Sequence, residues 1–473
     1  MRTISFLCAL GLFSAGMSCS RESAGDGDDT NSGTGADAGE DGGADTDADT
    51  DSDTDTGVSL CGEDIVPSTD FVLGDAAYDI PDLARPAKCE TYADQLYHTL
   101  VARMTDKAAD AYAAAGVTNE YSRADPENAD GSHAILRGVD GTFLVYDTSD
   151  FSVAADITPF VFLNQEPEPR WDPAEPAFLY FLDGMSLKRF DVGDMSSTTI
   201  HDFSAEFPAL AAAGGRISTG TEGEPSRDGN RFCFMVVDQD GAAHAFVSYD
   251  RQTDAVLGTM TAAGLSDTVN WASISATGAH CVLGFDLGGA TSYTGDFASH
   301  VDIAVMPGHG LGHSDFAVTT DGRDVTVFQD IRTDFITMGD LETGELTELV
   351  HIPFEVNPDI GLHFSGHGPA GWVLVSTSGA KNPPSGSSRS WMDTSLFFLE
   401  LGGAHRVLRV ASTYTYQAID YTGESNYFAE AFASTNRVGT RVYWGANFGQ
   451  GDLTSQFEVM VAILPEGWPA LLP

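Results

Sequence analysis

Residues 224–250 read EPSRDGNRFCFMVVDQDGAAHAFVSYD, and the same kind of pattern recurs along the chain. A polar segment ends in an Asp-Gly turn, a run rich in apolar residues follows, and a further run ends in Asp. Short alternating or apolar runs of this kind indicate β-strands, and Asp-Gly is a typical turn between antiparallel strands. The unit therefore predicts a small antiparallel sheet.

Six further copies follow the same plan. They begin at or centre on residues 128–147, 168–191, 271–278, 316–322, 371–376 and 431–444. The glycines of the predicted turns are Gly131, Gly229, Gly278, Gly322, Gly371 and Gly439. Most neighbouring turns are 44 or 49 residues apart, and the 98-residue step spans two units. Seven such units predict an all-β, seven-bladed β-propeller over residues 97–473. We expect residues 97–104, an alternating run, to supply the strand that closes the ring.

The N-terminal residues predict export. Residues 1–18 contain a short apolar run, typical of a signal peptide and too short to span a bilayer. Cys19 follows small residues and resembles the lipidated cysteine of the bacterial lipoprotein lipobox, although Gly16 stands where that motif usually has Leu. Ordinary secretion with cleavage nearby is the alternative. Residues 19–57 hold 13 acidic residues and no large apolar residue, which predicts a disordered tether. We therefore expect a protein of the bacterial envelope, lipid-anchored outside the cytoplasm on the outer membrane or cell surface.

The charge of the chain limits its partners. The formal net charge is −47, and residues 58–473 alone carry 57 acidic and 21 basic residues. Nucleic acids are excluded as partners because phosphate binding requires clustered cations. A surface that repels itself also favours a monomer, attached to a membrane through a lipid anchor only.

Four cysteines remain after the leader and Cys19 are set aside. Cys61 and Cys89 lie in a loop-rich lead-in, residues 58–96, and we predict that they form a disulfide. Cys233 and Cys281 lie within apolar strands, where they are either paired or buried as small hydrophobic residues.

The blades resemble known propeller families. Glu168–Pro173 and Glu224–Gly229 resemble the WD40-like (TolB-type) repeats of periplasmic propellers. Residues 97–465, including Met104–Asp106 and Glu120–Arg123, are similar to the oligogalacturonate lyase propellers. These motifs mostly specify strands, so the resemblance implies a fold far more than an activity.

Four histidines form the sharpest candidate site, a place for a divalent cation such as Mn²⁺, Zn²⁺ or Ca²⁺. They are His309, His313, His363 and His367, from two neighbouring blades. The lyase resemblance implies that His313, in Leu-Gly-His, is a metal ligand. It also implies a His-Pro-His segment in the last blade, where this chain has Ala429 and Ala431 with Glu430 between them. The alternative is that His313 and His367 hydrogen-bond loop carbonyls.

A second set comprises acidic residues near the starts of the first strands. They are Glu120, Glu166, Glu168, Glu222, Glu224 and Glu430. Such carboxylates can hold a cation or act as acid and base, and Arg123 and Arg170 are placed to clamp a uronate carboxylate. Alternatively, these carboxylates cap strands and form ion pairs with the two arginines.

The sequence favours a binding or scaffold module for a glycan or an envelope protein. The alternative is a cation-assisted, polysaccharide lyase-like enzyme acting on uronate-containing glycans. A metal site built on the lyase resemblance would lack most of its ligands, because Ala429 and Ala431 stand where histidines are expected. The sequence also contains no nucleophile elbow in a strand-to-helix context and no phosphate-binding loop.

Overall fold

The computed structural model describes residues 57–112, 116–286, 288–304, 311, 313–357, 360–378, 389–416, 427–449 and 457–473. The predicted leader, Cys19, His309 and all of the predicted tether except Gly57 lie outside these residues.

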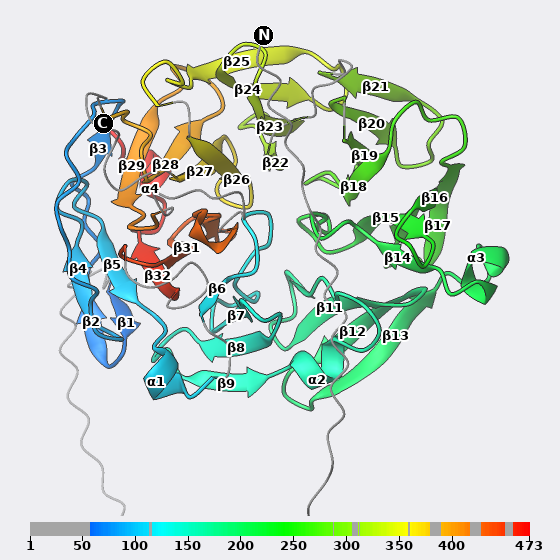
Figure 1. Cartoon of the computed structure of the whole chain (residues 1–473), viewed down its shortest axis with the longest axis horizontal. Helices are drawn as coiled ribbons and strands as arrows, with labels where there is room; N and C mark the ends of the chain where they lie inside the picture. Colours follow the sequence, from blue (N-terminus) through cyan, green and yellow to red (C-terminus); the bar gives the residue numbers. More distant parts are fainter. Residues whose placement is uncertain are drawn as a thin grey trace, which may run out of the picture. The chain divides into compact units, whose positions relative to one another are not determined.

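Seven antiparallel sheets stand around a central axis (Figure 1). The prediction of an all-β, seven-bladed propeller is therefore confirmed. Blade 1 comprises β6 (Val117–Asn119), β7 (His133–Gly138), β8 (Phe143–Asp147) and β9 (Val153–Asp156). Blade 2 comprises β10 (Arg170–Trp171), β11 (Phe178–Asp183), β12 (Ser186–Asp191) and β13 (Ser196–Asp202). Blade 3 comprises β14 (Arg216–Ser218), β15 (Arg231–Val237), β16 (Ala243–Asp250) and β17 (Ala255–Thr261).

Blades 4 to 7 continue around the ring. Blade 4 comprises β18 (Val269–Ile274), β19 (His280–Phe285), β20 (Ala290–Thr294) and β21 (His300–Ile303), and blade 5 comprises β22 (Ser314–Val318), β23 (Asp324–Asp330), β24 (Phe335–Asp340) and β25 (Leu346–His351). Blade 6 comprises β26 (Gly361–Ser365), β27 (Trp372–Ser378), β28 (Ser395–Glu400) and β29 (Val407–Ser412). Blade 7 begins with β30 (Ser434–Thr435), β31 (Arg441–Ala446) and β32 (Glu458–Ile463).

The last blade is completed from the other end of the chain. Strand β5 (Leu100–Arg103) pairs antiparallel with β32, with Val101 opposite Ala462, and β4 (Thr91–Ala93) pairs with β5. Strand β3 (Val72–Leu73) adds to the outer edge of β29 in blade 6. The predicted closing strand within residues 97–104 is thus confirmed, and parts of the lead-in belong to blades 6 and 7.

Short elements complete the described chain. They are the hairpin of β1 (Val58–Leu60) and β2 (Glu63–Ile65) and the helices α1 (Lys107–Asp110), α2 (Thr158–Val161), α3 (Pro208–Ala212), η1 (Tyr427–Ala429) and α4 (Trp468–Leu471). Among the described residues, none of these helices has the length and apolar character needed to cross a membrane.

The core lies between neighbouring blades, and strand β15 shows why. Phe232, Phe234 and Val236 pack in one apolar cluster with Tyr180 of blade 2. The alternate residues of the same strand, Cys233 and Met235 among them, pack with residues of blade 4. Because successive side chains of a strand point to opposite faces, each sheet buries both faces only when it has a neighbour on each side.

The turn glycines also hold the blades close together. All six predicted turn glycines have positive φ, between +67° and +88°. A Cβ atom on Gly229 would lie 2.6 Å from Cδ of Pro173 in blade 2, and one on Gly439 would lie 2.5 Å from Cδ of Pro369. These positions therefore require glycine for both the left-handed turn and the contact with the neighbouring blade.

Two disulfides staple the protein. Cys61 and Cys89 are paired as predicted, and Cys233 of β15 is joined to Cys281 of β19, which links blades 3 and 4. The second pair resolves the alternative that the sequence left open. Two disulfides suggest a location outside the reducing cytoplasm.

Candidate metal centre and channel network

Three potential metal ligands meet where the first strands of blades 5, 6 and 7 approach one another. His313 immediately precedes β22, His363 lies within β26, and Glu430 follows η1 just before β30. One ligand atom from each of these residues lies within 4.8 Å of the others. The imidazole rings of His313 and His363 are stacked, with centroids 4.0 Å apart and an interplanar angle of 18°.

Each of the two histidines has a ring nitrogen that can bind a ligand. Nδ1 of His313 donates to the carbonyl of Leu362 at 2.7 Å, so a neutral His313 keeps its Nε2 lone pair. His363 is 1 % exposed, and its Nε2 has no hydrogen-bond partner among the described residues. This Nε2 lies 3.7 Å from Oε2 of Glu430.

The charges of the group follow from burial. Burial, together with the nearby His313 and Arg123, lowers the pKa of His363 well below its usual value, so His363 is neutral at physiological pH. Burial raises the pKa of Glu430, and the neighbouring His313 opposes this shift. A cation between these groups would favour the ionised form of Glu430 and would satisfy Nε2 of His363.

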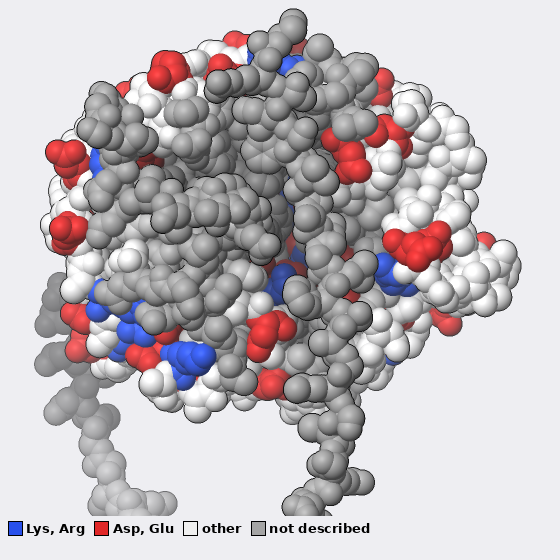
Figure 2. Space-filling model, in the orientation of Figure 1, with Lys and Arg blue, Asp and Glu red and all other residues white. Residues whose placement is uncertain are grey.

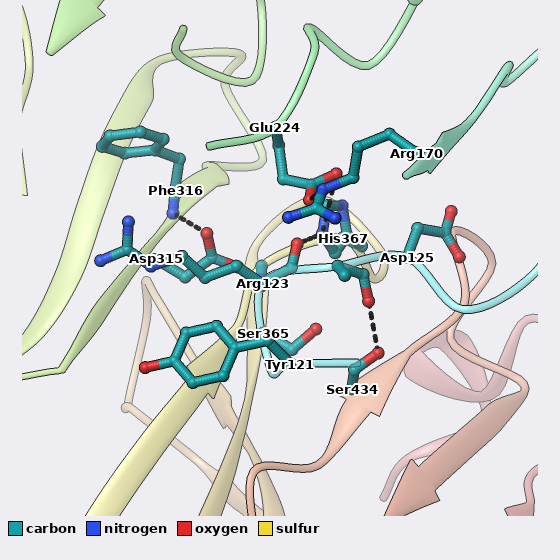
Figure 3. Close-up of polar contacts among 12 residues, drawn as sticks. Tyr121, Arg123, Asp125, Arg170, Glu224, Asp315, Phe316, Ser365, His367 and Ser434 are labelled. Atoms are coloured by element: carbon teal, nitrogen blue, oxygen red, sulfur yellow. Dashed lines mark hydrogen bonds and ion pairs between the residues drawn. The ribbon is translucent and has the colours of Figure 1, made fainter. Parts of the chain in front are cut away.

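A network of ion pairs connects the first strands of several blades, and part of it is drawn in Figure 3. Arg170 begins β10 and is buried, and its guanidinium forms ion pairs with both Glu120 and Glu224. Burial opposes the charge of this guanidinium, but the two carboxylates outweigh burial and raise the pKa of Arg170. Burial raises the pKa of Glu224 well above its usual value, although Arg170 opposes the shift.

Arg123 also forms an ion pair with a carboxylate of the protein. Its Nη2 lies 3.0 Å from Oε2 of Glu222 and donates to Oγ of Ser314 at 2.8 Å. The guanidinium carbon also lies 4.4 Å from the ring centroid of Trp271, within the range of a cation–π contact. Both Arg123 and Arg170 therefore already hold carboxylates of the protein itself, which is the alternative considered from the sequence.

The remaining predicted residues lie in structural positions. Glu168 is buried and accepts hydrogen bonds from Ser218 and Thr219, which joins the start of blade 2 to blade 3. Glu166 lies 3.2 Å from Nη2 of Arg137. Neither residue belongs to the His313 group, which contains only His313, His363 and Glu430 among the described residues.

His367 belongs to the ion-pair network and not to the histidine group. Its Nε2 donates to the backbone carbonyl of Arg123 and lies 4.0 Å from Oε2 of Glu224 (Figure 3). Burial, followed by the charge of Arg437, lowers the pKa of His367 to about 3. A neutral imidazole whose Nε2 carries the proton matches the carbonyl contact considered for His367 from the sequence.

Two buried acids of this network were not singled out from the sequence. Asp315 accepts hydrogen bonds from the amides of Phe316 and Gly366, and Asp125 lies 2.7 Å from Nε of Arg437. Burial raises the pKa of each carboxyl to about 7, although neighbouring arginines oppose the shift. Asp315 lies two residues after His313. In an extended chain this spacing places both side chains on the same side, so a candidate at His313 could have directed attention to Asp315 as well.

Comparisons with known proteins find likeness in structure but not in sequence. No family model matches the chain, and no curated protein matches it. An oligogalacturonate lyase solved in complex with manganese superposes with a TM-score of 0.53 at 15 % identity, over 80 % of this chain and 96 % of that one. An oligogalacturonate lyase from Vibrio parahaemolyticus gives a TM-score of 0.53 at 12 % identity, over 80 % and 97 %.

A third solved structure is a more distant propeller. The Cps50 (Swd1) β-propeller domain of Myceliophteria thermophila matches with a TM-score of 0.39 at 12 % identity, over 72 % of this chain and 96 % of that one. The likeness is one of fold. The chain is a β-propeller that distantly resembles oligogalacturonate lyase, and at these identities the likeness alone assigns no activity.

Proposed function

We propose that this protein binds a divalent transition-metal ion through His313, His363 and Glu430, and that the ion holds a carboxylate-bearing glycan at the channel mouth. The observation that carries this proposal is the buried Nε2 of His363, which has no hydrogen-bond partner among the described residues and faces Glu430 at 3.7 Å. A buried nitrogen without a partner is costly unless a ligand satisfies it.

The donor set favours some metals over others. Two imidazoles and one carboxylate suit Zn²⁺ or Mn²⁺, whereas Ca²⁺ prefers an all-oxygen shell. With three protein ligands, such an ion keeps further coordination positions, and these can accept an oxygen ligand such as a carboxylate. The residues present therefore fit a transition metal that remains open to a ligand.

The charge of the protein explains why a metal would be needed to bind an acidic glycan. Residues 58–473 carry 57 acidic and 21 basic residues. Acidic side chains lie at several separate places on the face of the protein that Figure 2 shows. The guanidinium groups of Arg123 and Arg170 are already paired within the channel. A divalent cation bound at His313, His363 and Glu430 would supply the positive charge that the paired arginines do not offer to a ligand.

The proposed location is the bacterial envelope, with a lipid on Cys19 holding the propeller outside the cytoplasm. The two disulfides support export, because such bonds persist in oxidising compartments. Labelled palmitate should be incorporated into the wild-type chain expressed in bacteria and not into Cys19→Ala. Equal labelling of both chains would exclude the anchor.

The first experiment is metal analysis. Purified protein, stripped with chelator and titrated with Zn²⁺ or Mn²⁺, should bind one ion, and His363→Ala and Glu430→Gln should each lose it. His351→Ala is the matched control, because His351 ends the outer strand β25 and is exposed. Equal metal content in wild type and His363→Ala would overturn the proposed site.

The second experiment tests the ligand. Polygalacturonate should bind the metal-loaded wild type, and chelation or the His363→Ala substitution should abolish this binding. Binding that survives chelation would contradict a metal-held carboxylate. Capture of an envelope protein instead of the glycan, equal with and without metal, would favour a scaffold role that does not use this site.

A lyase reaction is the second candidate, and the fold likeness to an oligogalacturonate lyase in complex with manganese favours it. A metal bound to a uronate carboxylate would make the neighbouring carbon-bound proton more acidic. Ultraviolet absorbance of an unsaturated product distinguishes this reaction from binding alone. Metal-dependent binding without such a product would exclude the lyase.

A further inference from the structure

A segment of blade 1 crosses to the three blades that supply His313, His363 and Glu430. This crossing segment comprises residues 119–124, from the last residue of β6 into the connection that leads to β7 (Figure 3). The side-chain amide of Asn119 donates to the carbonyl of Phe432 at 2.6 Å, and Ser434 donates to the carbonyl of Ala124 at 2.6 Å. The crossing segment is therefore fixed to blade 7 at Phe432 and at Ser434, the first residue of β30.

The crossing segment also contacts the other two blades that supply ligands. Arg123 donates to Ser314, which directly follows His313 in the chain. Its backbone carbonyl accepts a hydrogen bond from His367, which lies just beyond β26. Each of the three blades that supply a ligand is thus held by the same short segment.

The direct contact with a ligand is made by Tyr121. Its ring lies edge-on to the ring of His363, with centroids 5.7 Å apart and an interplanar angle of 86°. Phe432 meets His363 at 5.8 Å and 71°, and His313 stacks on His363 at 4.0 Å. The imidazole of His363 is therefore enclosed by three rings, in edge-to-face and stacked arrangements that aromatic groups favour.

We infer that Tyr121 is a positioning residue that fixes His363 with its Nε2 facing Glu430, so that the site is formed before a metal arrives. This inference rests on the proposed function for its metal readout. Replacing a group that orients a metal ligand from outside the coordination sphere typically weakens metal binding by about 10–100-fold, because a ligand that must be reoriented binds more weakly. The Nδ1 contact of His313 with Leu362 fixes the second imidazole in a similar manner.

The experiment compares Tyr121→Ala with Tyr121→Phe, which keeps the ring. Affinity for Zn²⁺ is measured by competition with a chromophoric chelator, and the site geometry by the visible spectrum of the Co²⁺ form. Tyr121→Ala should weaken Zn²⁺ binding by about 10–100-fold and broaden the Co²⁺ spectrum, whereas Tyr121→Phe should retain both properties. Wild-type affinity in Tyr121→Ala would overturn the inference.

Tyr293→Ala is the matched control for a general loss of stability. Tyr293 is a buried tyrosine of blade 4 that also contacts a histidine, His300, with centroids 5.3 Å apart. This variant should keep wild-type metal affinity, and an equal loss in Tyr293→Ala would show that the effect of Tyr121→Ala is not local. Should Tyr121→Ala fail to fold, Tyr121→Leu keeps the volume without the aromatic ring and should show the same weakening.

A metal-free readout separates this inference from the proposed function. In the metal-free protein, nuclear magnetic resonance of ¹⁵N-labelled histidine should show a His363 ring that is fixed in the wild type and mobile in Tyr121→Ala. If the wild type binds no metal but this difference is seen, the proposed function fails and the positioning role of Tyr121 stands. A His363 ring equally fixed in both proteins would exclude the positioning role, whatever the metal result.

Discussion

Replacing Arg170 by Met distinguishes a structural arginine from a ligand-binding one. The side chain of Arg170 is 5 % exposed, and its partners Glu120 and Glu224 are 7 % and 9 % exposed. Methionine fills a similar volume but leaves two buried carboxylates without their cation. Breaking a buried ion pair in this way costs about 3–5 kcal/mol, and we expect a loss of this size in the free energy of unfolding.

The pH dependence of the loss follows from Glu224. Its folded-state pKa is already raised by burial, and loss of the opposing Arg170 raises it further. A carboxyl whose pKa is raised on folding contributes stability that is fully present below its unfolded pKa, about 4.3, and is lost as the pH rises through the folded value. The deficit of Arg170→Met should therefore be larger at pH 8 than at pH 5.

Urea unfolding followed by tryptophan fluorescence at both pH values measures this loss. Adding Glu120→Gln and Glu224→Gln to Arg170→Met removes the unpaired charges and should restore most of the lost stability, because the three residues act as one network. Arg170→Met that unfolds like the wild type but no longer binds polygalacturonate would refute the structural role. Arg170 would then be the carboxylate clamp considered from the sequence.

Three further predictions concern the stability of the ring. The free energy of unfolding should fall as the pH rises from 5 to 8, because burial raises the pKa of Asp125 to about 7. The Asp125→Asn substitution should make the free energy of unfolding depend less on pH over this range. The same pH dependence in the variant and the wild type would exclude Asp125 as the titrating group. Replacing Cys233 and Cys281 by Ala should cost about 4 kcal/mol in urea unfolding, since their bond closes a loop with a sequence separation of 48; a loss below about 1 kcal/mol would contradict this effect. Val101→Asp should open the ring and make the protein sensitive to limited proteolysis, because Val101 is fully buried in the closing strand β5. The control Val66→Asp, at a position 68 % exposed, should remain resistant to the protease. Equal resistance of both variants would contradict closure of the ring by β5.

The fold was predictable because local patterns repeat along the chain. Alternating residues such as those of β15 mark strands, and turn glycines such as Gly229 mark the start of each second strand. The Cys233–Cys281 bond was also within reach of the sequence. The two cysteines are 48 residues apart, close to one repeat, and so occupy equivalent strands of neighbouring blades.

The site was only partly predictable, because strand ends determine which residues meet. His363 and His367 are four residues apart, a spacing that places both on one face of an uninterrupted strand. Strand β26 ends at Ser365, however, and His367 turns away to the carbonyl of Arg123. If β26 had continued for two more residues, the side chain of His367 would have lain on the same face as His363. The ends of strands are the part of a sequence-based assignment that is least certain.

The role of the crossing segment had no local signal. Tyr121 and His363 are far apart in the sequence, and nothing near Tyr121 indicates an aromatic partner in another blade. The ion pairs of Arg170 with Glu120 and Glu224 likewise span three blades. Contacts across a central channel depend on the closed ring as a whole, so a pattern confined to one repeat cannot reveal them.

Because β5 sits between β32 and β4, the seventh sheet cannot be finished until the C-terminal strands have been synthesised. Early in biogenesis, residues 91–103 have no completed β31–β32 partner, and the six blades made first form an arc with two unsatisfied ends. Joining such distant strands is slow, because the chain must lose much conformational entropy before the contact forms. We therefore expect newly synthesised molecules to pass through a protease-sensitive open arc, and the joining of β5 to β32 to limit the rate of maturation.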